Sequence, residues 1–185
     1  MLRGLHHRWL RLWALAALLT FIAGVPAATS ELDAEVRRAV QDLYATVPGA
    51  EALAREAAGM LVFPGVFAGG VVVGGEYGEG ALLVGGAVVD YYNTASASLG
   101  ITLGAQVKTQ ILMFMSAKAL TRFRDSRNWE IGVDEDVVLA APGQSGELDD
   151  EARDEPVVAF VFTHAGLMYN LSLEGSKITR LSQDD

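Results

Sequence analysis

Residues Gly65–Gly86 read GVFAGGVVVGGEYGEGALLVGG and contain nine glycines and no proline in 22 positions. Valines and leucines fill the spaces between the glycines, which distinguishes the stretch from a flexible Gly/Ser linker. Short apolar or β-branched runs separated by glycines are typical of strands with bulges or tight bends, where backbones approach closely. The stretch therefore predicts a curved β-sheet in which the glycines have a structural role.

The same stretch does not match a phosphate-binding loop. The motif Gly-x-x-x-x-Gly-Lys-Ser/Thr is absent, and glutamates at positions 76 and 79 beside the glycines would repel phosphate. Ala81–Val84 also lacks the features of the helix start that a dinucleotide-binding loop requires. We therefore expect no nucleotide cofactor.

The first 27 residues are predicted to be a signal peptide. Three arginines precede an uncharged apolar stretch, and the small residues around Pro26 provide a cleavage site before Ala28. A retained N-terminal membrane anchor is the alternative, although the strongly apolar part is short for a bilayer span of about 20 residues. We expect export by the general secretory route to the periplasm or the cell envelope.

Composition narrows the class of protein. Cleavage leaves 158 residues, enough for one domain with a core. It removes three arginines and no acidic residue, which changes the formal net charge from −9 to −12. Such an acidic chain is a poor binder of nucleic acid. The chain has no cysteine, which excludes disulfides, cysteine-bound metals and a lipidated N-terminal cysteine, so we do not expect a lipoprotein.

The helical signals lie mostly before the glycine-rich stretch. Apolar residues from Leu32 to Leu43 recur at helical spacing after an N-cap at Ser30, and they predict a helix that runs to about Ala45. Its apolar stripe is expected to pack on the sheet, with a membrane surface as the alternative. A second helix is predicted from Pro48 to a stop at Gly59, and a short one over Ala117–Arg124.

The rest of the pattern is β. The predicted strands are Met60–Phe63, Gly70–Val73, Ala81–Val84, Ala87–Tyr92, Ser96–Leu103, Gln106–Met115, Trp129–Val133, Val137–Ala140, Val157–Phe162, Leu167–Leu173 and Ser176–Leu181. Their close spacing argues for antiparallel connections. The expected fold class is α+β: a mainly antiparallel, curved, glycine-rich sheet, barrel-like or sandwich-like, with two N-terminal helices and one short inserted helix.

Four blocks, in this order along the chain, resemble the SYLF domain family. They are GMLVFPGVFAGGVVVGGEYGEGALLV (59–84), YYNTASASLGITLGAQ (91–106), WEIGVDEDVVL (129–139) and LSLEGSKITRL (171–181). The resemblance covers about Val36–Leu181 of a single domain over residues 28–185. It implies binding of phosphoinositides or other phospholipids and, in some eukaryotic members, actin binding; it does not imply an enzyme. For an exported protein we do not expect actin as the partner.

Five of the 11 cations that remain after cleavage lie in one short segment. They are Lys108, Lys118, Arg122, Arg124 and Arg127. Lys118 and Arg122 are one helical turn apart and share a face. Since each cation near an anionic surface contributes about 1 kcal/mol, we predict that this segment contacts lipid head groups. The alternative is an ordinary solvated helix.

Two further pairs are candidate membrane contacts. Arg37 and Arg38 on the first predicted helix form a second candidate site for lipid head groups. Phe63 and Phe67 flank Pro64-Gly65 and are candidates for a tip that inserts into the membrane, although aromatic residues are more often buried in a core.

Enzymatic and metal-dependent functions find little support in the residues. His164 is the one histidine left after cleavage, and the nucleophile motif Gly-x-Ser-x-Gly is absent. Glu76 and Glu79, three apart on a strand, face opposite sides. The acidic segment Pro142–Pro156 lacks the spacing of calcium ligands. We predict a non-enzymatic domain without metal or cofactor that binds a phospholipid membrane surface. The alternative is a structural or stress-related periplasmic protein with an unknown protein partner.

Overall fold

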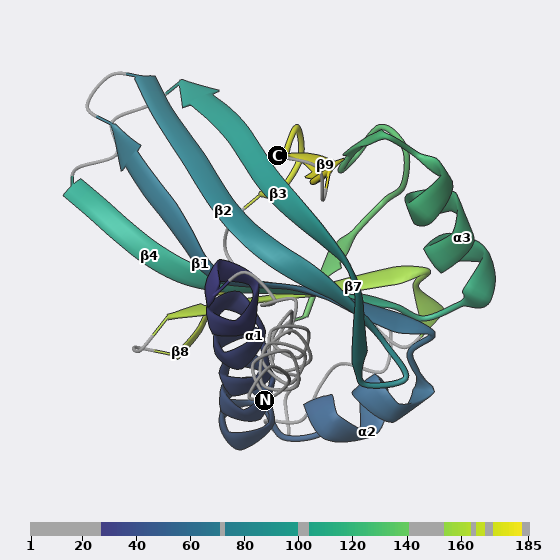
Figure 1. The fold of residues 1–185 in the computed structure, drawn as a ribbon. Coiled ribbons are helices and arrows are strands. Elements are labelled where there is room, and N and C mark those ends of the chain that lie inside the picture. The colour runs from purple at the N-terminus through teal and green to yellow at the C-terminus, as the bar shows by residue number, and fades with distance from the viewer. Residues whose placement is uncertain are drawn as a thin grey trace, which may run out of the picture. The chain divides into compact units, whose positions relative to one another are not determined.

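A mainly antiparallel sheet dominates the computed structural model of the protein (Figure 1). The structure describes residues 27–70, 73–99, 104–140, 154–163, 166–168 and 172–182. Residues from Glu31 onward form one unit. Almost all of the predicted signal peptide, most of the acidic segment Pro142–Pro156, and His164 lie outside the described residues.

Two helices precede the sheet and a third is inserted between strands. They are α1 (Ala27–Thr46), α2 (Ala50–Glu56) and α3 (Ala117–Asp125). The predicted N-cap Ser30 lies inside α1. α2 begins after Pro48 because Gly49, with φ of 84°, forms the turn that precedes it, and it ends three residues before Gly59. No helix in the described part of the chain is long and apolar enough to cross a bilayer.

The strands differ from the predicted ones mainly in length. They are β1 (Gly59–Gly70), β2 (Val73–Val84), β3 (Ala87–Leu99), β4 (Gly104–Phe114), β5 (Asn128–Glu130), β6 (Val138–Leu139), β7 (Val157–Thr163), β8 (Gly166–Met168) and β9 (Lys177–Arg180). The predicted strand Gly70–Val73 is wrong, because Gly70 ends β1 and Val73 begins β2. Glycines continue the long strands here instead of separating short ones.

The strand order of the sheet is β5-β9-β3-β2-β1-β4-β7-β6, and β8 pairs with β7. Among the described strands β6 and β7 run parallel, and the other pairs are antiparallel. The predicted fold class, α+β with a mainly antiparallel curved sheet, is confirmed.

A bulge in β1 bends the sheet near its centre. The register of β1 with β2 shifts between Val62 and Gly65. Pro64 lies in this bulge, where its lack of an N–H is tolerated inside a sheet. Its carbonyl oxygen accepts a hydrogen bond of 2.9 Å from the Thr109 hydroxyl of β4. The bulge increases the local twist and so contributes to the curvature.

Gly80 of β2 lies directly against this bulge. A Cβ atom at Gly80 would collide with the carbonyl oxygen of Val62 and would lie 2.5 Å from Cδ1 of Phe63. Gly78 is in a similar position, since its Cβ would lie 2.9 Å from the carbonyl oxygen of Gly65. These two glycines therefore permit the close backbone approach that the sequence predicted.

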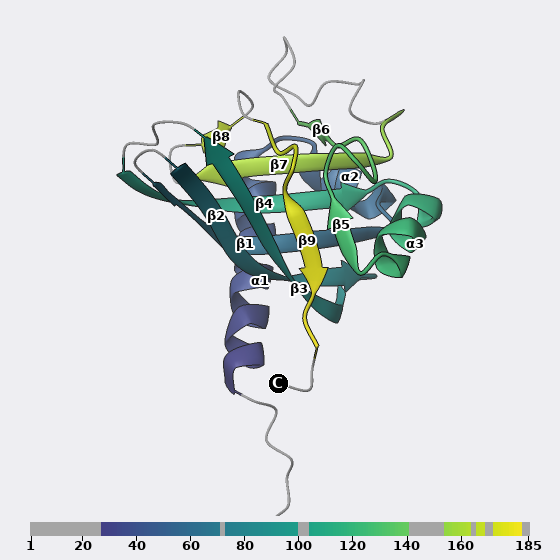
Figure 2. The same cartoon turned by 90° about the horizontal axis from the view of Figure 1, so that it is seen from above.

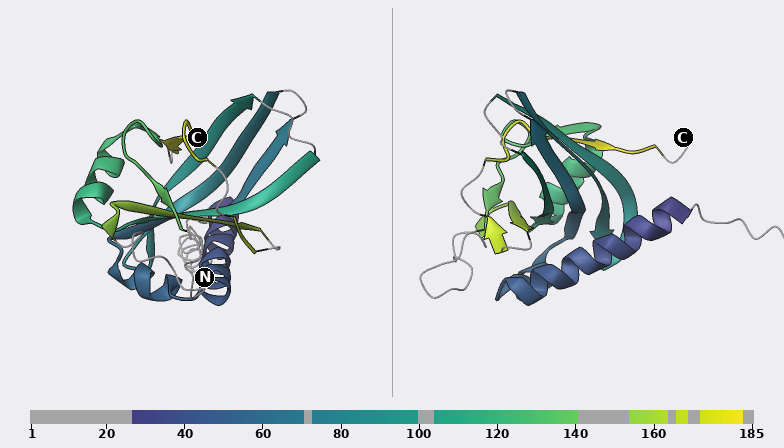
Figure 3. Two further views of the ribbon diagram at one scale, coloured as in Figure 1. Left: turned by 180° about the vertical axis from the view of Figure 1, so that it is seen from behind. Right: turned by 90° about the vertical axis from the view of Figure 1, so that its left-hand side faces the viewer.

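The two faces of the sheet carry separate apolar cores. On one face, the stripe of α1 that contains Val36, Val40 and Leu43 is buried with sheet residues such as Val62 and Ile111. The expected packing of α1 on the sheet is thus confirmed. The other face is covered by α3, β5 and β9, which the views in Figure 2 and Figure 3 show on the side opposite α1.

The sheet curls until strands far apart in its order meet. The rings of Phe114 in β4 and Trp129 in β5 are 6.2 Å apart, although four strands lie between β4 and β5 in the sheet order. The result is a strongly curled half-barrel, closed on its inner side by apolar side chains.

Substitution of Gly80 by alanine is expected to destabilise the fold. The new methyl group would overlap the backbone of Val62, and relief of this overlap requires movement of β1, at a cost of about 3 kcal/mol. Gly75→Ala in the same strand is the matched control, because the nearest atom to its Cβ, the carbonyl oxygen of Ser96, is 3.7 Å away. Urea denaturation measures both variants. Equal stability of the two would contradict the role given to Gly80.

Candidate functional site

The helix α3 displays cations because its other side is buried. The hydroxyl of Ser116 accepts a hydrogen bond of 3.1 Å from the backbone N–H of Ala119 and caps the helix. Leu120 and Phe123 face the core, whereas Lys118 and Arg122 lie on the exposed side. The predicted short helix and the shared face of these two cations are therefore confirmed.

Phe123 fixes α3 to the inner side of the half-barrel. Its ring lies 4.9 Å from that of Tyr92 in β3, 4.8 Å from Phe114 in β4 and 5.3 Å from Trp129 in β5. Aromatic pairs at these separations contribute about 0.5–1.5 kcal/mol each beyond the burial of their area. The position of the exposed face of α3 is thus set by a rigid aromatic cluster.

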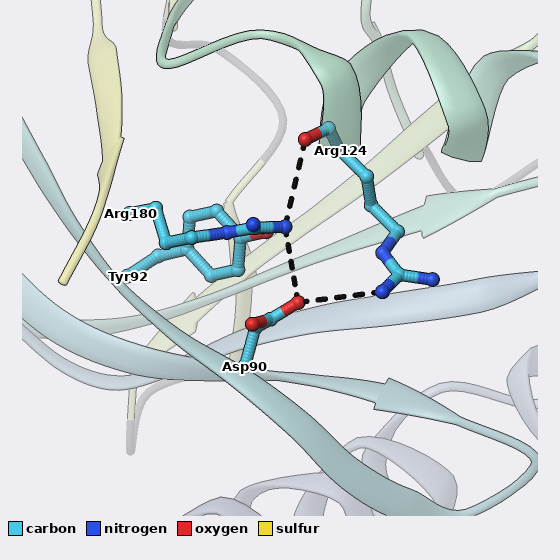
Figure 4. A network of polar contacts seen from close by, with 4 residues as sticks. All are labelled: Asp90, Tyr92, Arg124 and Arg180. Atoms are coloured by element: carbon cyan, nitrogen blue, oxygen red, sulfur yellow. Dashed lines mark hydrogen bonds and ion pairs between the residues drawn. The ribbon is translucent and has the colours of Figure 1, made fainter. Parts of the chain in front are cut away.

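A network of polar contacts joins α3 to β3 and β9 (Figure 4). Asp90 of β3 accepts a hydrogen bond of 3.1 Å from Arg180 of β9, and its carboxylate lies 3.6 Å from the guanidinium of Arg124. Arg180 also donates to the hydroxyl of Tyr92, at 3.1 and 3.2 Å, and stacks 5.7 Å from the centre of that ring. The Asp90 carboxylate therefore interacts with two guanidinium groups, those of Arg180 and Arg124.

The pKa values of Tyr92 and Arg180 are consistent with a permanent positive charge on the Arg180 guanidinium. Burial raises the pKa of the Tyr92 hydroxyl, and the hydrogen bonds from Arg180 oppose this increase. The hydrogen bond to Tyr92 raises the pKa of Arg180. At neutral pH the phenol is therefore neutral and the guanidinium is charged.

A comparison with protein families identifies the C-terminal half of the chain. Residues 95–185 match the family model Ysc84, described as "Las17-binding protein actin regulator". The match shows that residues 95–185 belong to the SYLF (Ysc84) family, as the sequence resemblance predicted. No curated protein matches the chain. The matched segment contains α3, Arg180 and the strands β4 to β9, whereas Asp90 and Tyr92 lie just before it.

Four of the predicted cations lie on or directly after α3 and differ in whether they have an ion-pair partner. Arg122 forms an ion pair of 2.6 Å with Glu135, and Arg124 shares Asp90 with Arg180. Among the described residues, Lys118 and Arg127 have no ion-pair partner. The structure thus keeps these four cations on or directly after α3.

Lys108 does not join them. Its side chain is 7% exposed, and its Nζ lies 2.8 Å from a carboxylate oxygen of Glu76 in β2, across the intervening strand β1. This ion pair neutralises its charge on the inner face of the sheet. The structure therefore does not bring Lys108 together with the four other cations of the predicted lipid-binding segment.

The other candidate residues also separate. Arg37 lies 3.9 Å from Asp33, whereas Arg38 lines a groove beside α1. Phe63 is fully buried and Phe67 is 53% exposed, so the predicted tip that combines both rings does not form. The bulge in β1 is the reason, because its extra residue reverses the facing of the strand between the two positions. Among the described residues no group of acidic or histidine side chains could hold a metal ion.

Sequence reasoning missed Asp90, Tyr92 and Arg180 as a unit. Asp90 and Arg180 are separated by 90 positions, and their contact depends on the pairing of β3 with β9, in which Tyr92 lies opposite Arg180. A charged residue after an apolar one in a short strand is too common a pattern to indicate this pairing.

Removal of the Arg180 side chain is expected to weaken the closure of the half-barrel. Arg180→Ala eliminates hydrogen bonds to Asp90 and Tyr92 that involve a charged group, and should lower the free energy of unfolding by about 2 kcal/mol. Lys177→Ala is the control in the same strand, because its exposed ion pair with Glu130, at 3.6 Å, contributes about 0.5 kcal/mol. Chemical denaturation compares them. A larger loss in the lysine variant would contradict this assignment.

The raised pKa of Tyr92 predicts a loss of stability in alkaline solution. In the unfolded chain the phenol ionises near its ordinary pKa of about 10, whereas in the folded protein it ionises at higher pH. The contribution is therefore fully present below pH 10 and is lost as the pH rises through the folded-state pKa. The free energy of unfolding should fall above pH 10, and Tyr92→Phe should reduce this fall. An identical pH dependence of the two proteins would contradict it.

Proposed function

We propose that this SYLF family member is a peripheral phospholipid-binding protein that contacts anionic head groups through α3 and β9. The contact region, named here the α3–β9 surface, contains five cations and three acidic residues. They are Lys118, Arg122, Arg124, Arg127 and Arg180, with Asp90, Asp125 and Glu135.

The charge of the α3–β9 surface is the observation that carries this proposal. The eight side chains that define it sum to +2, whereas the whole chain has a net charge of −9. The rest of the protein is thus repelled by an anionic membrane, and attraction is confined to one side. Local contacts of about 1 kcal/mol per cation then select an orientation of the protein on the surface.

The small net charge of the α3–β9 surface indicates weak, salt-dependent binding to the membrane. Lys118 and Arg127 are exposed and have no ion-pair partner among the described residues, so their charges are available to phosphate groups. Exposed charges are screened beyond a Debye length of about 8 Å at physiological ionic strength. Binding of this kind requires contact between α3 and the head groups and weakens as salt is added.

The proposed place of action is the cell envelope, on the exported side of a membrane. This part of the proposal rests on the N-terminal segment, in which Arg3, Arg8 and Arg11 precede an apolar stretch and a cleavage site before Ala28. The family description names an actin regulator that binds Las17. An exported protein would not meet actin, so the proposal includes phospholipid and no actin, and it includes no enzymatic step.

Co-sedimentation with vesicles tests the proposal. The protein is expected to sediment with vesicles that contain anionic phosphatidylglycerol, less with phosphatidylcholine alone, and less again in high salt. The double variant Lys118→Glu, Arg127→Glu should bind anionic vesicles at least about 30-fold more weakly, since it removes two unpaired cations worth about 1 kcal/mol each and adds two negative charges.

A second double variant controls for net charge. Arg37→Glu, Arg55→Glu makes the same change in net charge on the exposed sides of α1 and α2 and should leave sedimentation nearly unchanged. If the control variant loses binding and the α3 variant keeps it, the contact site is wrong. Recovery of the wild-type protein in the supernatant under every condition would refute lipid binding and favour a protein partner.

A further inference from the structure

A groove with a volume of about 760 Å³ lies between α1 and the strands β1, β4 and β7. Glu35, Arg38 and Asp42 of α1 form one wall, and Val107, Thr109 and Phe162 contribute to the floor. The groove is on the α1 face of the sheet, on the opposite side of the sheet from the α3–β9 surface.

The two flanks of α1 differ. On the flank toward β3, Asp33 accepts a hydrogen bond of 3.0 Å from the hydroxyl of Tyr91 and lies 3.9 Å from Arg37. On the flank toward β4 and β7, Arg38 lines the groove. The neighbouring arginines 37 and 38 therefore occupy different surfaces, and only the second of them belongs to the groove wall.

The wall carries charges of both signs within one helical face. Arg38 follows Glu35 by three positions and precedes Asp42 by four, a spacing that puts Cβ atoms about 5–6 Å apart. Among the described residues, Arg38 has no ion-pair partner. Lys108 borders the groove as well, but its side chain lies on the inner face of the sheet, where Glu76 binds its ammonium. A wall with two carboxylates and one guanidinium repels a purely anionic ligand and suits a zwitterion.

The floor continues into an exposed apolar row. Val107 of β4 lies opposite Phe67 of β1, which in turn lies opposite Tyr77 of β2. Because directly opposite residues share one face of a sheet, these three side chains form one row. Val107, Phe67 and Tyr77 are 60, 53 and 49% exposed. Contiguous large apolar side chains on a surface mark contact with a ligand, a membrane or a partner.

We propose that the groove and the apolar row bind one phospholipid with a phosphoethanolamine head group. Arg38 would hold the phosphate, either Glu35 or Asp42, which flank Arg38 about one helical turn to each side, would hold the ammonium, and the row from Val107 to Phe67 an acyl chain. A primary ammonium suits this wall because it donates hydrogen bonds to carboxylates. The inference rests on the proposed function in that the ligand is a phospholipid, but it assigns a different surface and a different head-group charge.

Titration with a short-chain phosphatidylethanolamine, below the concentration at which it aggregates, tests the proposal by calorimetry on the purified protein. Arg38→Gln and Val107→Asp are expected to weaken binding about tenfold each, whereas Arg37→Gln should bind like the wild type. Both substituted positions of the groove are exposed, so folding is preserved and is verified by circular dichroism.

Two further ligands distinguish the contribution of the head group to binding from that of the acyl chains. Phosphatidylglycerol of the same chain length lacks the ammonium and should bind about tenfold more weakly, and this preference should vanish in Glu35→Gln, Asp42→Asn. Glycerophosphoethanolamine lacks the chains and should bind more weakly than the lipid. Absence of binding, equal affinity for both lipids, or wild-type affinity in Arg38→Gln would overturn the proposal.

The experiment also distinguishes the two sites. Lys118→Glu, Arg127→Glu should retain the affinity for short-chain phosphatidylethanolamine while it loses sedimentation with anionic vesicles. Binding to the vesicles without binding of the short-chain lipid would refute the groove alone. The reverse result would refute the α3–β9 surface alone.

Discussion

The contact between the Gly80 backbone and the bulge in β1 is the constraint on which the rest of the molecule depends. Because no Cβ stands between them, the carbonyl of Val62 and the ring of Phe63 occupy the space over β2. The bulge bends the strand and puts Phe67 on the opposite face from Phe63, and the bent sheet brings β4 opposite β5. The aromatic cluster that positions α3 exists only in this curled geometry. The absence of a side chain at Gly80 thus determines where the cations of α3 are displayed.

Local sequence signals were sufficient to predict the helices and the fold class. The spacing from Leu32 to Leu43 predicted the buried stripe of α1, and the close spacing of the predicted strands predicted an antiparallel sheet. The lengths of β1, β2 and β3 were underestimated, because a run of glycine has no apolar period although its backbone pairs like any other. Phe63 and Phe67 could not be separated by sequence, since a regular strand puts residues four apart on one face and the bulge does not.

The contacts that make up the candidate site are mostly long-range, which explains why the sequence indicated cations and not their partners. Glu76 reaches Lys108 across a whole strand, and Asp90 meets Arg180 only through the pairing of β3 with β9. The resulting electrostatics differ from a simple sum over one segment. Lys108 is withdrawn from the surface, and Arg180 is added to it from the far end of the sheet. A strongly acidic protein thereby keeps a small region of opposite charge.

The place of β9 in the sheet has a consequence for the order of assembly. β9 lies between β3 and β5, so β5 acquires its backbone partners in the sheet through β9. Thr179 and Asn128, which face each other across these strands, are 51 positions apart. During synthesis β1, β2 and β3 can form a meander as they emerge and β4 can then pair with β1, whereas the inner side stays open to water until the later strand arrives. The hydrophobic interior of the half-barrel is therefore completed late, and a nascent chain that stops before Lys177 exposes it.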